Sequence, residues 1–414
     1  MNMNAARSRL DVTTHPGAGH PGLRILICTD WWDQTVNGVV TSVQTLRREL
    51  EGQGHEVRVL TLAEGVRARH GDGVYRMGSV SGAMFYAKLR IGHPVQDRIH
   101  RDVVAWRPDI VHAHSEFSTF PWAKRIAREV DAPLVHTYHT LYEDYTHYYS
   151  PSHAMGRRMA AAFSRHALAA TDHVIAPTGK IARLLREYGV TTPIQVIPTG
   201  LCLDAFRPAR NATDLREVER LRHRYRIDPK RHVLVSVGRL AKEKNLDDVL
   251  SHLAALTRRD WTLLLVGDGP FRTTLEQQVQ ELRLDDHVIF TGCVDRRHVP
   301  SHYHLGDAFV SASTSETQGL TYAEAMACGI PLLCRRDEAL RGVLEHGVTG
   351  FGFDNAAQFA AGIETLFDDD AARRRMGSAA SAHAHRTCGS RAFGRAVADV
   401  YHVARMSRTC PHVA

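Results

Sequence analysis

The sequence of 414 residues lacks the features of several protein classes. Its seven cysteines form no CxxC pair, so we expect neither a disulfide framework nor a structural zinc site, and the pattern favours a reduced, cytoplasmic setting. No uncharged apolar run approaches the roughly 20 residues of a membrane-spanning helix. Residues 1–22 contain no apolar core of a secretory signal, and we expect a flexible N-terminal tail there.

Acidic residues are outnumbered, because 45 Asp and Glu face 52 Lys and Arg, which gives a formal net charge of +7. A basic balance suits phosphate-rich ligands, an anionic membrane surface or nucleic acid. Charges of both signs are nevertheless interleaved along the chain, as on an ordinary solvated surface, and no nucleic-acid-binding motif accompanies them. We therefore expect no nucleic-acid partner.

Short apolar runs alternate with longer amphipathic stretches, which predicts parallel sheets connected by helices. Near-continuous runs such as LRILI, HVLVSV and TLLLV suit strands that are buried on both faces. The predicted strands are 23–30, 56–62, 74–77, 109–114, 133–139, 173–177, 194–198, 232–237, 261–266, 288–291, 308–311, 331–334 and 351–353. The predicted helices include 40–53, 122–130, 157–170, 180–188 and 246–256.

The alternation of strands and helices starts twice, with LRILICTD near the beginning and HVLVSVGRL in the middle. Residues 203–230, between these two starts, are polar and helical and contain no buried strand. We therefore predict two doubly wound, Rossmann-like domains, 23–204 and 205–389, that face each other across a cleft. A C-terminal helix within 390–414 is expected to pack back on the first domain and to end in a tail. Ligands of such domains bind after the carboxyl ends of the strands.

The most informative segment is SASTSETQGLTYAEAMACGIP, which ends at Pro331. A predicted strand leads into a polar loop with Glu316, and a helix begins near Gly319 with Glu324 in its second turn. Free amides at the helix start would form an anion site, and the glycine would let a phosphate approach closely. Two carboxylates beside a phosphate would bind hydroxyl groups, which suggests a sugar and a ribose. An ordinary capped helix with surface glutamates is the alternative.

The segment VSVGRLAKEKN places Arg239 and Lys244 together in a loop that follows a predicted strand. An arginine holds two phosphate oxygens with its planar fork, and a lysine adds a mobile point charge. The pair would neutralise a diphosphate, particularly one that acts as a leaving group. A solvated basic loop is the alternative, since Glu243 lies among these cations.

Two shorter loops also follow predicted strands. VGDGP contains Gly267 in a tight turn and matches neither GxGxxG nor GxxxxGK[ST]. TVNGVVTSV joins the first strand to its helix through Asn37 and Gly38, and this glycine would let the backbone approach a ligand across the cleft. Taken alone, each loop is more typical of a plain turn.

The segment PLVHTYHTLYEDYTHYYSP concentrates rings and hydroxyl-bonding groups after a predicted strand, which suits carbohydrate recognition; its members are His136, His139, Tyr142, Glu143, Asp144, Tyr145 and His147. The spacings His112-x-His114 and His136-x-x-His139 raise the alternative of a metal site. Strand alternation places residues i and i+3 on opposite faces, and no HExxH or Cys/His set is present, so we expect no metal.

Taken in order, the five segments resemble glycosyltransferase family 4, the retaining enzymes of GT-B fold, over essentially all of the chain after the tail. Glu316 and Glu324 carry this resemblance most strongly, with GRLAKEKN and VGDGP beside them. VNGVVTSV, HTYHTLYEDYTHY and SASTSETQGLTYAEAMA are similar to the diacylglycerol glucosyltransferases of bacterial glycolipid synthesis. Thr317 and Gln318 stand where many other members have Pro-Phe, as they do in this lipid subgroup.

The resemblance implies a role for each candidate residue. Glu316 would contact donor-sugar hydroxyls, and Glu324 would bind the ribose. His139 would touch the 6-hydroxyl of the sugar or the forming bond. The implied catalytic residues are Glu316, Arg239, Lys244 and His139, and the implied donor-binding residues are Gly38, Val39, Arg239, Lys244, Gly267, Glu316, Thr317, Gln318, Gly319, Leu320 and Glu324.

The resemblance also implies a retaining hexosyltransferase that moves glucose from UDP-glucose to the free hydroxyl of diacylglycerol. It implies no cofactor and no protein nucleophile, because the leaving phosphate oxygen removes the proton of the acceptor on the same face. Electrostatic stabilisation of the diphosphate is then the principal catalytic effect. The alternatives are a phosphoinositide, polyprenyl phosphate or soluble acceptor, and, outside catalysis, a nucleotide-sugar-binding protein on a degenerate fold.

The lipid relatives usually carry a Lys-rich amphipathic patch in the first domain, whereas this chain contains little lysine. The candidate substitute is the segment 84–102. It would lie on an anionic bilayer, or else turn its apolar side inward as an ordinary surface helix. The residues expected to contact the acceptor or the membrane are Phe85, Tyr86, Lys88, Arg90, Tyr142 and Tyr145. The expected location is the inner face of the cell membrane.

Overall fold

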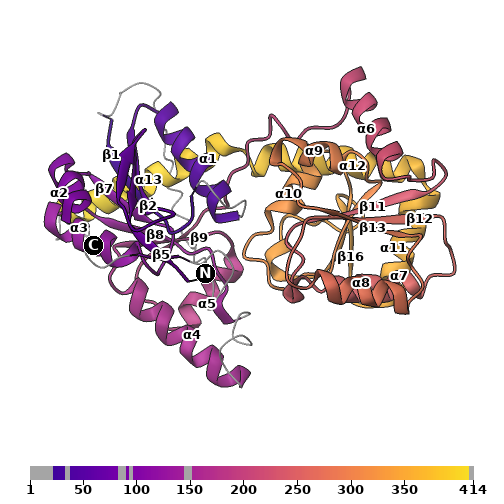
Figure 1. Ribbon diagram of the computed structural model, residues 1–414, viewed down its shortest axis with the longest axis horizontal. Coiled ribbons are helices and arrows are strands. Elements are labelled where there is room, and N and C mark those ends of the chain that lie inside the picture. Colours follow the sequence, from indigo (N-terminus) through magenta and orange to yellow (C-terminus); the bar gives the residue numbers. More distant parts are fainter. Residues whose placement is uncertain (1–21, 33–37, 83–89, 93–96, 144–151, 410–414) are drawn as a thin grey trace, which may run out of the picture.

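The computed structural model describes residues 22–32, 38–82, 90–92, 97–143 and 152–409. It consists of two α/β domains that lie side by side along the longest axis of the molecule (Figure 1). Each domain is built on a sheet of mainly parallel strands with helices packed against it. This is the predicted pair of doubly wound, Rossmann-like domains.

The N-terminal domain has an eight-stranded sheet of order β10-β9-β8-β7-β1-β2-β4-β3. Its strands are Arg24–Cys28 (β1), Glu56–Leu62 (β2), Arg69–Gly71 (β3), Val74–Met77 (β4), Ile110–Ala113 (β7), Leu134–Thr137 (β8), His173–Ala176 (β9) and Ile194–Val196 (β10), and β5 (Ser79–Ser81) and β6 (Arg90–Gly92) form a separate pair. Its helices are Gly38–Gly52 (α1), Asp97–Trp106 (α2), Phe120–Val130 (α3), His153–Leu168 (α4) and Gly179–Glu187 (α5).

The C-terminal domain has a six-stranded parallel sheet of order β13-β12-β11-β14-β15-β16. Its strands are His232–Val237 (β11), Trp261–Val266 (β12), Val288–Gly292 (β13), Ala308–Ser311 (β14), Leu332–Arg335 (β15) and Gly350–Phe353 (β16). Its α-helices are Ala212–Arg224 (α6), Leu246–Ala254 (α7), Arg272–Glu281 (α8), Val299–Tyr303 (α9), Leu320–Ala327 (α10), Ala356–Asp368 (α11) and Asp370–Thr387 (α12), and its 3-10 turns are Lys242–Lys244 (η2), Arg296–His298 (η3) and Glu338–Leu340 (η4).

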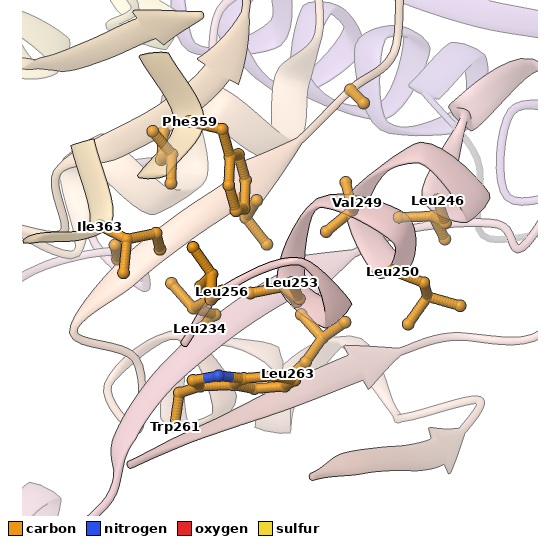
Figure 2. Packing of buried hydrophobic residues seen from close by; sticks show 14 of the residues in the cluster. Leu234, Leu246, Val249, Leu250, Leu253, Leu256, Trp261, Leu263, Phe359 and Ile363 are labelled. Carbon is orange, nitrogen blue, oxygen red and sulfur yellow. The ribbon is translucent and has the colours of Figure 1, made fainter. Parts of the chain in front are cut away.

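The central strands of the second sheet are buried because apolar side chains project from both faces and pack against helices on each side. All six residues of β12 are buried, and Trp261 and Leu263 are fully inaccessible. Figure 2 shows these two side chains packed with the leucines of α7 and with Phe359 and Ile363 of α11. The packed core therefore fixes the positions of the strands, and the strands in turn position the loops at the carboxyl edge of the sheet.

The predicted strand boundaries agree with the structure within two residues for all thirteen predicted strands. The short strands β3, β5 and β6 were not predicted, because none of them contains an apolar run. All three residues of β3 are exposed. Its hairpin with β4 turns at Asp72 and Gly73, whose φ values of 53° and 71° are typical of a type I′ turn. The dipeptide Asp-Gly was the available signal.

The chain passes between the domains twice, and the two crossing segments are hydrogen-bonded to each other. Leu201 N donates to Cys388 O at 2.7 Å, and Ser390 N donates to Leu201 O at 3.1 Å. After the second crossing, the helix α13 (Ser390–Thr409) contacts α1 and contributes Phe393 and Val397 to the core of the N-terminal domain. The last helix therefore belongs in space to the first domain.

None of the helices in the described ranges combines the length and the apolar character that a membrane crossing requires.

The backbones of the loops after β11 and β12 are in direct contact at Gly267, so we expect this position not to tolerate a side chain. A Cβ atom on Gly267 would lie 1.9 Å from Gly238 O, and the φ of Gly267 is 142°. We expect Gly267→Ala to lower the free energy of unfolding by about 2–4 kcal/mol, as measured by urea denaturation. Gly179→Ala is the control, because a Cβ there meets nothing within 4 Å. Equal stability of the two variants would contradict this account.

Candidate active site

An ion pair between two loops forms the centre of the candidate site. Lys244 ends the 3-10 turn η2 after β11, and Glu316 lies in the loop between β14 and α10. Because β11 and β14 are neighbours in the sheet, their carboxyl ends bring the two loops together. Lys244 Nζ lies 2.5 Å from Glu316 Oε1. The structure thus places two predicted site residues in direct contact.

The lysine keeps Glu316 ionised. Burial would raise the pKa of Glu316, but the charge and hydrogen bond of Lys244 oppose burial, with help from Ser313 and Lys180. The net pKa of Glu316 is lowered from its usual value. Since both side chains remain partly exposed, at 30% for Lys244 and 14% for Glu316, a ligand can reach the pair.

Arg239 is also paired with a carboxylate, because its guanidinium donates to Glu243 Oε1 four residues further along the chain. The Glu243 side chain is only 5% exposed, and its Oε2 has no hydrogen-bond partner among the described residues. Asn245 adopts a left-handed φ of 49° and donates its side-chain amide to Ala312 O at 3.2 Å. This contact ties the loop that holds both cations to the loop that holds Glu316.

The helix α10 begins without a side-chain cap at Gly319, which has a left-handed φ of 69°. A Cβ on Gly319 would lie 2.1 Å from the Tyr322 ring, so only glycine fits. The uncapped first turn leaves backbone amides oriented for an anion. Across the domain boundary, a Cβ on Gly38 would lie 3.6 Å from Leu320 Cδ1. The start of α1 therefore meets the start of α10, while the side chain of Val39 packs on the N-terminal core.

Glu324 lies inside α10 and is 5% exposed. Its Oε1 accepts from Arg296 Nη2 at 3.3 Å, and its Oε2 accepts from Tyr303 OH at 3.0 Å. Burial raises the pKa of Glu324, and the opposing effects of Arg296 and Tyr303 do not cancel the rise. A ribose at this carboxylate would share it with two resident donors.

The N-terminal domain holds the Glu316 loop at three points. Thr178 Oγ1 donates to Thr317 O at 2.9 Å, and Lys180 Nζ donates to Thr314 O at 2.9 Å. The amide of Gln318 accepts from Thr199 N at 2.7 Å and donates to Thr199 O at 2.9 Å. The side chain of Gln318 therefore joins the two domains. Sequence reasoning missed Thr178, Lys180 and Thr199, although each follows a predicted strand, where ligand-facing residues are expected.

His139 belongs to a buried histidine cluster at the carboxyl ends of β7 and β8. Its Nε2 lies 2.9 Å from His114 Nδ1, and His112 joins Thr137 Oγ1 at 2.8 Å and Tyr401 OH at 2.7 Å. Burial lowers the pKa of His139 to about 4. At neutral pH the ring of His139 is uncharged, so it can donate a hydrogen bond to a hydroxyl group or accept one from it.

Glu116 is a further carboxylate of the candidate site, and sequence reasoning missed it. It is 9% exposed, lies 3.0 Å from His136 Nε2 and accepts a short hydrogen bond from Tyr142 OH. His114 Nε2 and His136 Nδ1, both buried, have no hydrogen-bond partner among the described residues. Glu116 follows a predicted strand in the sequence HSEF, which was the available signal. The carboxylate of Glu116 can therefore accept hydrogen bonds from hydroxyl groups of a ligand beside His139.

The remaining predicted contacts fall into two groups. Phe85, Tyr86, Lys88 and Tyr145 lie outside the described residues. Arg90 turns onto β5, where its Nε donates to Ser79 Oγ at 2.6 Å. Within the described ranges, no three His, Cys, Asp or Glu side chains are arranged to hold a metal ion.

Known proteins are similar to this chain along most of its length. The model for "Glycosyltransferase Family 4" matches residues 36–205, and the model for "Glycosyl transferases group 1" matches residues 217–383. An alpha-monoglucosyldiacylglycerol synthase of Streptococcus pneumoniae is 36% identical over 332 residues, which cover 79% of this chain and 74% of that protein. The enzyme of the same name from Acholeplasma laidlawii is 29% identical, over 80% of this chain and 85% of that protein.

Solved structures share the arrangement of the two domains. The structure of Anabaena HepE in complex with UDP-glucose matches with a TM-score of 0.72 at 19% identity, over 92% of this chain and all of that one. Fold and sequence together define a glycosyltransferase enzyme of the GT-B class. More narrowly, the chain belongs to glycosyltransferase family 4: the model of that name matches its first half, and the Streptococcus pneumoniae relative extends the match over both halves.

The buried histidines predict an acid-sensitive fold. The pKa of His139 is about 4 in the folded protein and about 6.5 in an unfolded chain, so the unfolded state binds more protons between these values. The contribution of His139 to the free energy of unfolding is complete above about pH 6.5 and is lost progressively as the pH falls to about 4. We expect urea denaturation at pH 7 and pH 5 to show a loss of about 2 kcal/mol from this residue, reduced in His139→Gln.

The exposed His298 provides the matched control, because His298→Gln should keep the pH dependence of the wild-type protein. An unchanged pH dependence in His139→Gln would show that this ring is not protected from protonation.

Proposed function

We propose that this protein transfers glucose from UDP-glucose to the free hydroxyl of diacylglycerol, with retention of the α configuration. The observation that carries the proposal is the contact of Lys244 with Glu316 beside the uncapped start of α10. In a nucleotide sugar, the hexose is bonded directly to the diphosphate. A donor site therefore needs a phosphate-binding cation next to a carboxylate that accepts sugar hydroxyls.

The relatives support the acceptor. Two similar proteins, from Streptococcus pneumoniae and Acholeplasma laidlawii, are both called alpha-monoglucosyldiacylglycerol synthase, and each match covers more than two thirds of both chains. The name specifies glucose in the α configuration on diacylglycerol. The donor UDP-glucose agrees with the HepE complex of the same fold.

The proposed donor site assigns separate parts of the nucleotide sugar to separate elements. Lys244 and Arg239 bind the diphosphate, with the amides at Gly319 and Leu320 and, across the boundary, the backbone at Gly38. Glu316 accepts sugar hydroxyls. Glu324 and the backbone of the loops after β12 and β14, including Gly267 and Thr317, complete the nucleotide site. Without a ligand, Arg239 is paired with Glu243. When the nucleotide sugar binds, its diphosphate displaces the carboxylate of Glu243 from Arg239.

In the proposed reaction, the bond between the anomeric carbon and the β-phosphate oxygen breaks. The acceptor oxygen forms its bond on the same face, and its proton passes to the departing phosphate oxygen. Lys244 and Arg239 stabilise the charge that develops on the diphosphate, which is the principal catalytic effect. Neutral His139 and Glu116 bind hydroxyls next to this bond. The proposal requires no metal ion or cofactor, because the two cations of the chain neutralise the leaving group.

The proposed location is the cytoplasmic face of the membrane, where the protein is peripheral. Diacylglycerol resides in a bilayer, whereas nucleotide sugars are water-soluble, so the enzyme must act at the boundary between the two.

The reaction is tested directly with radiolabelled UDP-glucose and diacylglycerol in anionic vesicles. We expect a monoglucosyl-diacylglycerol whose anomeric proton identifies the α linkage by NMR. A panel of nucleotide sugars at fixed acceptor, and of phosphoinositide, polyprenyl phosphate and soluble acceptors at fixed donor, completes the experiment. A β-linked product would contradict retention, and absence of any glycolipid with every donor would defeat the lipid acceptor.

Two neighbouring lysines allow a matched test of the leaving-group site. Lys244 contacts Glu316, whereas Lys242 is exposed in the same turn. We expect Lys244→Ala to lower kcat about 10²–10³-fold, because the charge on the diphosphate is left without its partner. Lys242→Ala should stay within about twofold of wild type. Equal activity of both variants with wild type would remove Lys244 from the site.

A further inference from the structure

Three large apolar side chains of α4 are exposed to solvent. Met155, Met159 and Phe163 have exposed fractions of 51%, 50% and 38%. They are spaced four residues apart, so they form one stripe along the helix. The adjacent side of α4, roughly 100° around the helix, packs on the domain, where Ser164 Oγ lies 2.9 Å from Tyr138 OH. In Figure 1, α4 lies at the lower edge of the N-terminal domain.

A neighbouring loop extends this stripe. Phe117, between β7 and α3, is 53% exposed and stacks on Phe163 with ring centroids 5.8 Å apart. Residues from two separate elements thus form one apolar surface, which we call the α4 face: Met155, Met159, Phe163 and Phe117. A contiguous apolar surface of this kind marks a contact with a partner or a membrane.

The charge on α4 indicates which partner. The helix contains three arginines and no acidic residue. The exposed Arg158 and Arg165 lie roughly 60–80° around the helix from Met155, on the side away from Phe163. The third arginine, Arg157, is exposed and is paired with Glu143 and Glu187 at 3.3 Å and 3.1 Å. An apolar stripe with a basic flank suits the surface of an anionic bilayer, where the rings enter the acyl region and the arginines meet phosphates.

The α4 face is continuous with the acceptor end of the site. The Tyr142 ring packs edge-on against Phe163 at 5.4 Å and Phe117 at 5.9 Å. The hydroxyl of the same tyrosine donates to Glu116, beside the histidine cluster. One side chain therefore touches the apolar surface with its ring and the polar site with its oxygen. A lipid with a hydroxyl head and apolar chains matches this sequence of environments.

We propose that the α4 face docks this protein on an anionic phospholipid bilayer and so brings Glu116 and His139 to the level of the acceptor hydroxyl. The assignment of the acceptor hydroxyl rests on the proposed function, whereas bilayer binding by the α4 face does not. The proposed docking surface is thus α4 and the loop after β7, and the segment 84–102 stays a separate prediction from the sequence.

The test measures binding of the full-length protein to vesicles of phosphatidylglycerol and phosphatidylcholine by co-sedimentation. The variant Met155→Ser/Met159→Ser/Phe163→Ser changes exposed side chains only, so we expect it to fold. Its vesicle affinity should fall at least about tenfold, because three apolar insertions are lost. The control Leu215→Ser/Val348→Ser/Met406→Ser removes three exposed apolar side chains elsewhere, at 55%, 49% and 70% exposure, and should bind as wild type does.

The role of charge is tested by Arg158→Glu, which should weaken binding to anionic vesicles severalfold and leave the weak binding to pure phosphatidylcholine unchanged. Wild-type affinity of the triple α4 variant would overturn the proposal. So would loss of vesicle binding in Phe85→Ser/Tyr86→Ser without any loss in the triple α4 variant, since the docking surface would then be the segment 84–102.

Transfer assays separate this proposal from the proposed function. The α4 variant for these assays is Met155→Ser/Met159→Ser, because it leaves Phe163 in place against Tyr142. It should glucosylate a water-dispersed short-chain diacylglycerol at the wild-type rate and lose transfer to long-chain diacylglycerol in vesicles. Equal transfer by the variant and wild type to the vesicle substrate would overturn docking by the α4 face. If wild type glucosylates neither substrate but the α4 variant loses vesicle affinity, the proposed acceptor is wrong and the docking surface stands.

Discussion

The ion pair between Lys244 and Glu316 is the contact on which the candidate site depends. It exists because β11 and β14 are adjacent parallel strands, so that the loops at their carboxyl ends must meet. The pair holds a cation and an ionised carboxylate side by side at the carboxyl edge of the sheet. Glycines support this arrangement: Gly267 lets two backbone loops touch, and Gly319 starts α10 with a left-handed turn. The proposed chemistry therefore follows from the topology of the sheet.

The second domain alone does not hold the site in place. The loop with Glu316 accepts hydrogen bonds from Thr178 and Lys180, and its Gln318 clasps the backbone of Thr199. These partners come from the ends of strands in the N-terminal domain, which also carries the histidine cluster. The proposed donor and acceptor groups are thus positioned by one shared boundary, so a displacement of either domain would alter the donor loop and its distance from His139 together.

The sheets and the domain pair were predictable because buried parallel strands leave long apolar runs, as in β11 and β12. The exposed strand β3 left no such run, and only its Asp-Gly turn marked it. For the site, residue types after strands indicated Glu316 and Lys244, and the structure brought them into contact. Glu116 was not predicted, because its partners His136 and Tyr142 come from another strand end, and such pairing appears only when the sheet is assembled. The four-residue spacing of Met155, Met159 and Phe163 is visible in the sequence, but the sequence does not show that this side of α4 is exposed.

The two passages of the chain between the domains have a mechanical consequence. Because Leu201 exchanges hydrogen bonds with Cys388 and Ser390, the passages form a miniature two-stranded ribbon instead of two independent tethers. A ribbon of this kind resists sliding and stretching, and Gly200 packs so closely on Ser390 and Phe393 that it has little room to shear. Any separation of the two domains must therefore break the hydrogen bonds of Thr178, Lys180 and Gln318, while this paired crossing keeps the domains joined.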